Sequence, residues 1–426
     1  MKSGWVWWLV SVGMMLLVGC DQVTSLVATP TATMIVPTAT TAPLPTATPV
    51  PAPYTVAGFE ALVRELEGTR LAARQGIVNR YLAGLQRAPL LTDREALFVW
   101  QGGGFRVQLV GDMNNWSLDE GDDFQRVEGT DLWYLRLSLP AEARLDYKIV
   151  VNEREWLLDP LNGRTVQGGF GPNSEVVMPG YEPLPPVTAG VPQGELATHT
   201  LDSRYLEEKR TFFVYTPAVT VSGGGGYPSL YVQDGGDYLN IVDMTARLDR
   251  WIALGEVPPL VVVFIPPIQR SVEYRANDDY VAFLAEELVP WVEAEYGTAS
   301  SSVLTGVMGS SLGGLIAVYA GLRAPDTFGL VLAQSGAYRV EMKRWEALVA
   351  EGLGKGGRYY LVAGSFETAV SGDPWFGDII AANEELTSRL QREGYTYQYE
   401  VYPQGHSWGL WRDTLKDGLN YLYGGG

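Results

Sequence analysis

The sequence predicts an α/β fold, a doubly wound and mostly parallel sheet, preceded by a small β-sandwich. Between residues 196 and 426, short apolar runs alternate with helical patterns, which is typical of a parallel sheet covered by helices on both faces. Between residues 93 and 180, short alternating strands are separated by turn residues. The length of 426 residues and the apolar content of 46% are sufficient for two hydrophobic cores.

Composition excludes several classes of function. A net charge of -18 and the absence of any Lys/Arg-rich run disfavour nucleic acid as a partner. A single cysteine, Cys20, excludes an intramolecular disulfide and a multi-thiolate metal site. The only two histidines, His199 and His406, make a His-rich metal site equally unexpected. We therefore expect no metal and no other cofactor.

The N-terminus has the pattern of an export signal. Lys2 precedes an apolar run from Trp5 to Val18, which is too short to span a membrane and predicts a signal peptide over residues 1–19. The ending Leu17-Val18-Gly19-Cys20 resembles the lipobox of bacterial lipoproteins. The resemblance implies a diacylated Cys20 and an exported lipoprotein, anchored in the membrane at the bacterial cell surface or in the periplasm. The alternative is a cleaved secretory signal with an incidental cysteine.

Two segments connect this signal to the predicted sandwich. Residues 20–54 carry the cysteine and a Thr/Pro-rich tract with few large apolar residues, which predicts a disordered tether. Residues 55–92 show helical spacing of apolar residues, and we expect one or two helices that pack on the next domain.

The sandwich is predicted from four runs of alternating residues, Phe105 to Val110, Leu132 to Leu139, Asp146 to Val151 and Val176 to Met178. Its motifs resemble, in order, those of immunoglobulin-like glycogen-binding modules: Gly111 to Trp116, Tyr147 to Val151, Trp156 to Pro160 and Pro172 to Ser174. The resemblance implies glucan binding by Trp116, Lys148, Trp156 and Asn173. Aromatic faces pack on sugar rings, and Lys and Asn hydrogen-bond to hydroxyl groups. The alternative is a plain N-terminal domain in which both tryptophans are structural.

A Pro-rich linker, residues 181–195, precedes the predicted parallel sheet. Its strands are expected at Phe212 to Tyr215, Ser229 to Gln233, Leu260 to Ile265, Ser302 to Met308, Leu330 to Ala333, Tyr359 to Ala363 and Tyr397 to Tyr402. The clearest helical patterns are Asp279 to Tyr296, Leu312 to Arg323 and Asp378 to Arg392. Catalytic groups in such a sheet gather at the carboxyl ends of the strands.

Two segments match Gly-x-Ser-x-Gly, one centred on Ser311 and one on Ser407. A nucleophile elbow needs a strand before the serine, a helix after it and small neighbours, because the turn is strained and crowded. Ser311 satisfies all three conditions. Ser407 is followed by bulky Trp408 and by no long helical pattern, so Ser311 is the predicted nucleophile.

The remaining members of a triad follow from the order serine, acid, histidine. Only His406 lies after Ser311, whereas His199 fits an ordinary strand position. Glu367 follows a predicted strand through a short turn and is the expected acid, with Asp373 and Asp378 as alternatives. In this interpretation the serine attacks an ester carbonyl, the histidine takes its proton and the acid orients the imidazole.

The oxyanion requires two backbone donors. The first is expected from Leu312, directly after the nucleophile. The second is expected from the turn after the strand Ser229 to Gln233, at Gly236 or else Gly235, because a residue without a Cβ lets the backbone approach the substrate.

These segments resemble the enterochelin (ferric siderophore) esterases and their relatives, the feruloyl and acetylxylan esterases of the esterase D superfamily. The resemblance is carried by Leu230 to Gly236, Gly309 to Gly314, Phe328 to Gly336, Gly405 to Trp408 and Trp411-Arg412. It implies an α/β-hydrolase fold with Ser311 and His406 as nucleophile and base, and it supports Glu367 as the acid. The sequence departs from the family in one respect, since aspartate is common at the acid position and some siderophore esterases use serine and histidine alone.

The expected substrate is a siderophore-type ester or a feruloylated or acetylated polysaccharide. Arg275 could meet an anionic ligand or be a surface charge, and Trp408 is expected to contact the substrate. Two alternatives are acyl transfer to a sugar acceptor and an inactive, carbohydrate-binding surface lipoprotein.

Overall fold

The computed structural model describes residues 54–169, 171–187, 190–219, 226–369 and 376–424. The predicted signal peptide, Cys20 and the tether lie outside these residues, as does Asp373. In the described part of the chain no helix has both the length and the apolar character needed to cross a membrane.

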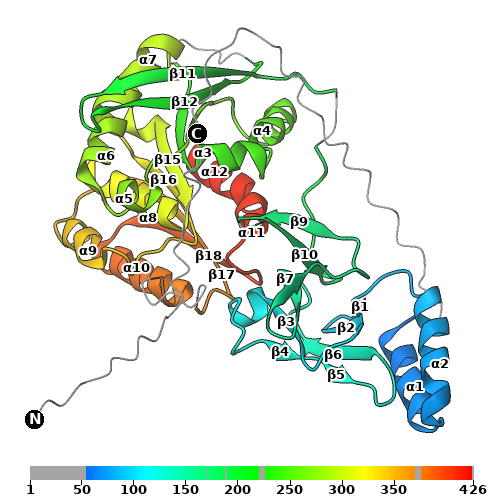
Figure 1. Cartoon of the computed structure of the whole chain (residues 1–426). Helices are drawn as coiled ribbons and strands as arrows, with labels where there is room; N and C mark the ends of the chain where they lie inside the picture. The colour runs from blue at the N-terminus through cyan, green and yellow to red at the C-terminus, as the bar shows by residue number, and fades with distance from the viewer. Residues whose placement is uncertain (1–53, 170, 188–189, 220–225, 370–375, 425–426) are drawn as a thin grey trace, which may run out of the picture.

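The larger part of the structure is an eight-stranded sheet in the order β11-β12-β14-β13-β15-β16-β17-β18 (Figure 1). Strands β11, β12 and β14 pair antiparallel, and the pairs from β14 through β13 to β18 are parallel. The bounds are β11 Glu195–Ser203, β12 Glu208–Thr216, β13 Ser229–Gln233, β14 Val261–Ile265, β15 Thr305–Ser310, β16 Leu330–Gln334, β17 Arg358–Gly364 and β18 Thr396–Tyr402.

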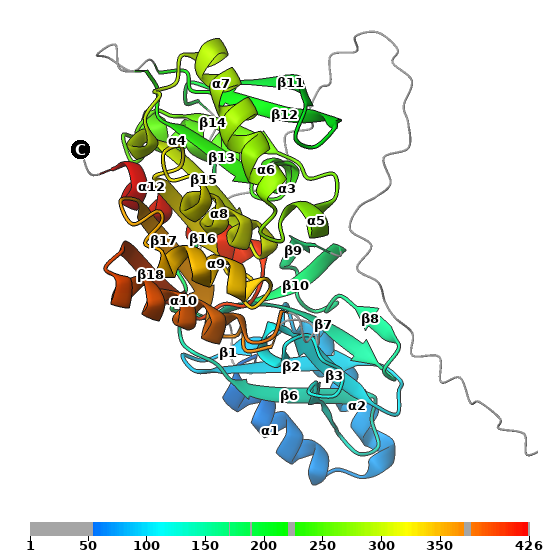
Figure 2. The ribbon, with the colours of Figure 1, turned by 90° about the vertical axis from the view of Figure 1, so that its left-hand side faces the viewer.

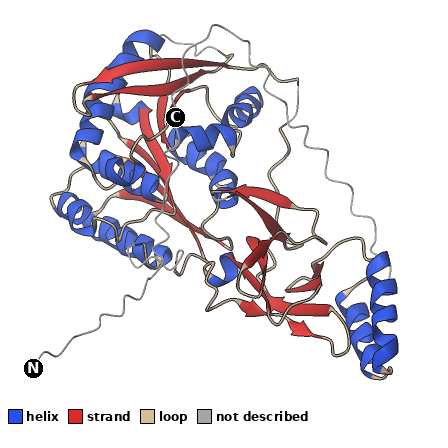
Figure 3. Cartoon of the chain, viewed as in Figure 1, coloured by secondary structure: helices blue, strands red, loops and turns tan. Residues whose placement is uncertain are grey.

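Helices cover both faces of this sheet (Figures 1 and 3). Every residue of the central strands β13 to β16 is therefore buried. In β14, Val261, Val263 and Ile265 face one core, whereas Val262 and Phe264 face the other, as the two-residue period of a strand requires. The first core is completed by α6 Asp278–Ala282, its π-helical continuation Phe283–Leu288, α7 Val289–Tyr296, α8 Leu312–Arg323, α9 Met342–Ala350 and α10 Ile379–Glu393. The second contains residues of α3 Gly235–Asn240, α4 Met244–Ala253, α11 Trp408–Asp413 and α12 Leu415–Tyr423.

The N-terminal domain is a β-sandwich. One sheet has the order β1-β2-β6-β5 and the other β4-β3-β7-β10-β9, with β8 also paired to β7. The bounds are β1 Leu90–Leu91, β2 Glu95–Gln101, β3 Val107–Gly111, β4 Asp122–Asp123, β5 Gln125–Arg126, β6 Leu132–Ser138, β7 Arg144–Val151, β8 Glu155–Leu157, β9 Thr165–Gly168 and β10 Gly171–Val177. The two sheets meet in a core where Phe98 packs edge-on against Tyr147, with ring centroids 5.1 Å apart.

Helices α1 Val56–Glu67 and α2 Leu71–Gly84 cover the outer face of the first sandwich sheet. Phe59 and Leu62 of α1 are buried in one cluster with Leu97 and Val99 of β2. The other sheet of the sandwich faces the eight-stranded domain, with β9 and β10 next to it (Figure 2). Strand β9 contacts α11, and Arg144 of β7 bridges to Gln404 after β18. The predicted fold class, an α/β sheet preceded by a small β-sandwich, is confirmed.

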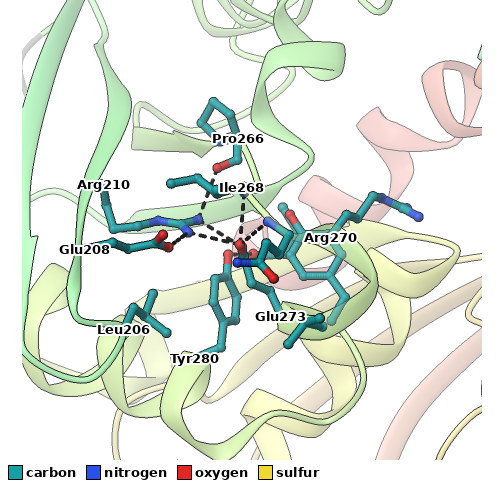
Figure 4. A network of polar contacts seen from close by, with 12 residues as sticks. Leu206, Glu208, Arg210, Pro266, Ile268, Arg270, Glu273 and Tyr280 are labelled. Carbon is teal, nitrogen blue, oxygen red and sulfur yellow. Dashed lines mark hydrogen bonds and ion pairs between the residues drawn. The ribbon is translucent and has the colours of Figure 1, made fainter. Parts of the chain in front are cut away.

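A buried ion pair ties β12 to the segment after β14. Figure 4 shows the Arg210 guanidinium between Glu208 and Glu273, which is the last residue of α5 Arg270–Glu273. The Glu273 carboxylate also accepts the backbone N–H groups of Ile268 and Gln269. Because each buried charge is paired and hydrogen-bonded, the connection from β14 to α5 is held in one conformation.

Candidate active site

Ser311 occupies the sharp turn between β15 and α8. Its backbone has φ 58° and ψ -121°, a conformation that costs a non-glycine residue on the order of 1–3 kcal/mol. The turn requires glycine at position 309, because a Cβ atom there would lie 2.5 Å from the Gly313 carbonyl group, and it is tight at Gly314, where a Cβ atom would lie 3.1 Å from the Gly336 Cα atom. The local geometry is therefore that of a strained strand-to-helix elbow with small neighbours.

Ser407, in the second Gly-x-Ser-x-Gly segment, lies in a different environment. It precedes α11 with φ -142° and ψ 155°, which is relaxed extended backbone. Its Oγ atom accepts a hydrogen bond from Nη1 of Arg144 at 3.1 Å. This serine thus has neither the strained backbone nor the free hydroxyl group of an elbow nucleophile.

His406 and Glu367 are brought together by two adjacent parallel strands. Glu367 follows β17 and His406 follows β18, and the ends of these strands pair at Gly364 and Tyr402. His406 Nδ1 lies 2.9 Å from Glu367 Oε1, and Oε2 of the same carboxylate accepts the Gly364 N–H at 2.9 Å. Glu367 is 1% exposed. The carboxylate is therefore fixed by its own turn and directed at the imidazole.

The other alternative for the acid that the structure describes has a different role. Asp378 is the N-cap of α10, where its side chain accepts the Ala381 N–H at 2.9 Å. The His406 ring packs against the Trp411 ring in an edge-to-face arrangement, with the ring centroids 5.1 Å apart. The Trp411 indole in turn donates to Ser335 Oγ at 2.9 Å.

The two predicted oxyanion donors lie at helix N-termini. Leu312 is the first residue of α8, and Gly236 lies in the first turn of α3. Neither N–H group donates to any residue within the described ranges. A Cβ atom on Gly236 would meet nothing within 4 Å, whereas one on Gly235 would overlap the backbone of β14. Gly236 therefore faces open space, and Gly235 is required for close packing.

The turn before these glycines is held by a charged pair. Asp234 has φ 54°, and its carboxylate accepts two hydrogen bonds from Arg270, each 2.8 Å long. The Asp234 N–H donates to the Tyr274 hydroxyl at 2.9 Å. Arg270 is the first residue of α5, and Glu273 at the other end of this helix is paired with Arg210. The bidentate contact between Arg270 and Asp234 therefore connects the turn to a helix that is itself held in place.

A cavity of about 380 Å³ lies where the sandwich meets the eight-stranded domain. This volume is sufficient for a small-molecule ligand. The sandwich contributes all four positions that correspond to glucan-binding residues, Trp116, Lys148, Trp156 and Asn173. The other domain contributes Glu367, His406, Trp408 and Trp411. Ser311, Gly236 and Arg275 are not among the lining residues, so the cavity extends from the imidazole toward the sandwich.

The charges of this cavity are mixed. Burial and the neighbouring Asp146 carboxylate raise the pKa of Asp112 to about 7. Asp146 is paired with Arg144 at 2.8 Å. Lys148 is half-buried and forms no ion pair with a residue that the structure describes. The cavity thus presents a free cation and several aromatic faces beside buried carboxyl groups.

Arg275 and His199 do not line this cavity. Arg275 is half-buried in the turn after α5, where it has no hydrogen bond or ion pair to the described residues. His199 lies on the edge strand β11, where its ring packs against Trp291 at 4.8 Å and its Nε2 contacts the Tyr296 hydroxyl. This ordinary strand position agrees with the role expected for His199.

Sequence reasoning missed the buried polar residues at the junction, chiefly Arg144, Asp112 and Asp146. Asp112 was visible within the Gly111 to Trp116 motif, and it accepts hydrogen bonds from the Trp116 indole and the Asp146 N–H. No pattern in the sequence indicates Arg144.

Comparison with known proteins identifies the family. Residues 203–422 match the family model described as "Putative esterase". The chain belongs to this esterase family. The esterase is 26% identical over 357 residues to the iron(III) enterobactin esterase of Escherichia coli O6:H1, a match that covers 74% of this chain and 86% of that protein. It is also 26% identical to the iron(III) salmochelin esterase of the same organism, covering 78% and 88%.

Solved structures give the same result. The crystal structure of the enterobactin esterase from Shigella flexneri in the presence of enterobactin has a TM-score of 0.64 and 26% identity to this esterase, and it covers 78% of this chain and 94% of that one. The coverage exceeds the catalytic domain, so the likeness extends into the sandwich.

Replacing Glu367 with glutamine is expected to lower kcat by about 10⁴-fold, as loss of the orienting acid does in other serine triads. The amide cannot stabilise the imidazolium that forms when the nucleophile is deprotonated. Steady-state kinetics with p-nitrophenyl acetate would measure the change.

Asp378→Asn and Asp373→Asn are the matched controls, and each should stay within about tenfold of wild type. A collapse in one of these variants with normal turnover in Glu367→Gln would contradict the assignment of the acid. Normal turnover in all three would indicate a Ser311 and His406 dyad.

Proposed function

We propose that the esterase hydrolyses carboxylic esters through an acyl-enzyme formed on Ser311. The Ser311 hydroxyl attacks the ester carbonyl while His406 accepts its proton, and His406 then protonates the departing alcohol. Water, deprotonated by the same imidazole, attacks the acyl-enzyme and releases the acid. The observation that carries this proposal is the 2.9 Å hydrogen bond between His406 and Glu367. The strained elbow at Ser311 and the unpaired Leu312 and Gly236 N–H groups support it further.

Ser311→Ala is expected to lower kcat for p-nitrophenyl acetate on the order of 10⁶-fold, as loss of a triad nucleophile does elsewhere. Ser407→Ala should cost far less, at most about 10²-fold, because it loses one hydrogen bond to the loop of His406 and no reacting atom. The full-length protein, purified in detergent, should keep its rate in the presence of a chelator. If the two serine variants behaved in the reverse order, the nucleophile would be Ser407, and a rate abolished by chelation would contradict the metal-free mechanism.

We propose a siderophore-type ester as the leading substrate. The similarity to enterobactin and salmochelin esterases spans most of both chains. One related structure, at a TM-score of 0.60 and 26% identity, is that of the Shigella flexneri enzyme in the presence of 2,3-dihydroxy-N-benzoyl-serine. The tryptophans of the cavity offer flat faces on which an aromatic acyl group could stack.

A second candidate is an acylated polysaccharide, favoured by a specific observation. The four sandwich positions that correspond to glucan-binding residues all line the cavity beside His406. A sugar ring held there would lie next to the reacting histidine. Lys148 and Asn173 would supply the hydrogen bonds to hydroxyl groups.

Parallel assays on ferric enterobactin, feruloylated xylan and acetylated xylan would distinguish the two substrates. We expect the highest kcat/KM with ferric enterobactin. Trp156→Ala should raise KM for the preferred substrate about tenfold, because one aromatic face is lost, and should leave p-nitrophenyl acetate turnover unchanged. Phe105→Ala, an exposed aromatic of the same sandwich outside the cavity, is the control. Preference for either xylan would overturn the siderophore assignment and support the glycan one.

We also propose that the esterase is a lipoprotein anchored through Cys20. The support is the sequence Leu17-Val18-Gly19-Cys20 after an apolar run, and a diacylated cysteine holds a protein stably on a membrane. The tether would then display both domains away from the bilayer.

Cys20→Ala is expected to abolish lipid modification and to leave an unprocessed or released protein. Metabolic labelling with a radioactive fatty acid, followed by membrane fractionation, would measure both properties. A labelled Cys20→Ala variant at wild-type level in the membrane fraction would contradict the anchor.

A further inference from the structure

We propose that Arg144, in strand β7 of the sandwich, is a positioning residue that sets the orientation of His406 from the neighbouring domain. The sandwich is then part of the catalytic apparatus as well as a wall of the cavity. This inference rests on the proposed function, because it takes His406 as the base. It follows from the contacts that the sandwich makes with the loop of His406 and with the loop of Glu367.

The loop that carries His406, residues 403–409, lies directly against the sandwich. The Arg144 N–H donates to the Pro403 carbonyl at 3.3 Å, and Arg144 forms an isolated parallel bridge with Gln404. Both glycines that flank the histidine are packed without space for a side chain: a Cβ atom on Gly405 would overlap the Asp112 carboxyl group, and one on Gly409 would overlap the Arg144 guanidinium. His406 is therefore bracketed by two close contacts with the sandwich.

The Arg144 side chain completes this contact. It is fully buried, and Nη1 donates to the Oγ atom of Ser407, the residue after the histidine. Burial alone would lower the pKa of Arg144, but the carboxylates of Asp146 and Glu175 raise it, so the guanidinium remains charged. These carboxylates lie 2.8 Å and 2.5 Å away. A buried cation with two sandwich carboxylates has little freedom to move, and it presents a fixed donor to the histidine loop.

The acid loop is held by the same domain. Phe366, directly before Glu367, packs against the hydrophobic core of the sandwich. Two residues after Glu367, the Ala369 N–H donates to Asn115 Oδ1 at 2.9 Å. The two loops also bond to each other, since the Phe366 N–H donates to the Gln404 carbonyl at 3.2 Å. Both members of the His406 and Glu367 pair therefore depend on the sandwich for their backbone positions.

Arg144 does not touch Ser311 or an oxyanion donor, so its contribution must act through the histidine loop. An error of about 1 Å in the position of a reacting group can cost about 10²-fold in rate. Loss of Arg144 should therefore lower kcat, while the binding of a small ester, which does not extend to the sandwich wall, should be unaffected.

The experiment compares Arg144→Met with Arg144→Lys in the full-length protein, using p-nitrophenyl acetate. We expect kcat to fall about 10²-fold in Arg144→Met with KM within twofold of wild type. Lysine keeps the charge but not the planar fork of donors, so Arg144→Lys should recover part of the loss. Folding would be verified by circular dichroism and gel filtration. The control is Arg106→Met, which removes an arginine paired with two carboxylates in the same sandwich, on a partly exposed surface, and kcat should stay within twofold.

A folded Arg144→Met protein with kcat within threefold of wild type would overturn the inference, even with a lower Tm, because the role would then be structural only. If Arg144→Met did not fold, Arg144→Lys and Asn115→Gly would decide. Glycine keeps the positive φ of Asn115, 55°, while it removes the acceptor for the acid loop. Loss of kcat at constant KM in both variants would support the inference, and wild-type kcat in both would overturn it. Failure of the proposed function itself would instead appear as an active Ser311→Ala protein.

Discussion

The site depends on the parallel pairing of β15 through β18, because parallel strands deliver their carboxyl ends to one edge of the sheet. Ser311 follows β15, Glu367 follows β17 and His406 follows β18. The register that pairs Gly364 with Tyr402 places the acid loop and the histidine loop side by side, so a single carboxylate oxygen reaches the imidazole at 2.9 Å. A sheet made of such strands must be buried on both faces, which explains the two cores and the helices that form them.

The sandwich contacts the eight-stranded domain at this same edge of the sheet. The contact buries charged side chains, and their loss of hydration must be offset by neighbouring polar groups. Arg144 and Asp112 are both buried at the junction, and each would be unfavourable there alone. The Asp146 carboxylate pairs with Arg144, and the Asp146 N–H donates to Asp112, but the same carboxylate repels the charge of Asp112. Burial and this repulsion raise the pKa of Asp112, whereas its hydrogen bonds and Arg144 act in the opposite direction. Buried polar networks of this kind favour one arrangement over others, and here the selected arrangement is that of the loops around His406.

The sequence predicts most of the sheet, because its central strands are short runs of mainly apolar residues. The bounds of β13 and α8 agree with the expected Ser229 to Gln233 and Leu312 to Arg323. The extent of strand β11 was not predicted, although His199 was expected in a strand, because most of its residues are at least partly exposed and carry no apolar pattern. Motif and order were sufficient to select Ser311, His406 and Glu367 as candidates. Arg144 could not be found in this way, since arginine is rarely buried and its partner Ser407 lies 263 residues away across a domain boundary.

The motif Gly111 to Trp116, which resembles that of glycogen-binding modules, shows that a motif can specify a local fold without specifying a function. Gly111 is required because a Cβ atom would overlap the Asp146 carbonyl oxygen, and Asn114 accepts the Gly111 N–H. These motif residues therefore specify a turn, whatever the domain binds. Only the side chains that leave the turn and reach the cavity, such as Trp116, can contact a ligand. Because that cavity also contains His406, the two resemblances seen in the sequence, one to a sugar-binding module and one to an esterase, converge on one composite site.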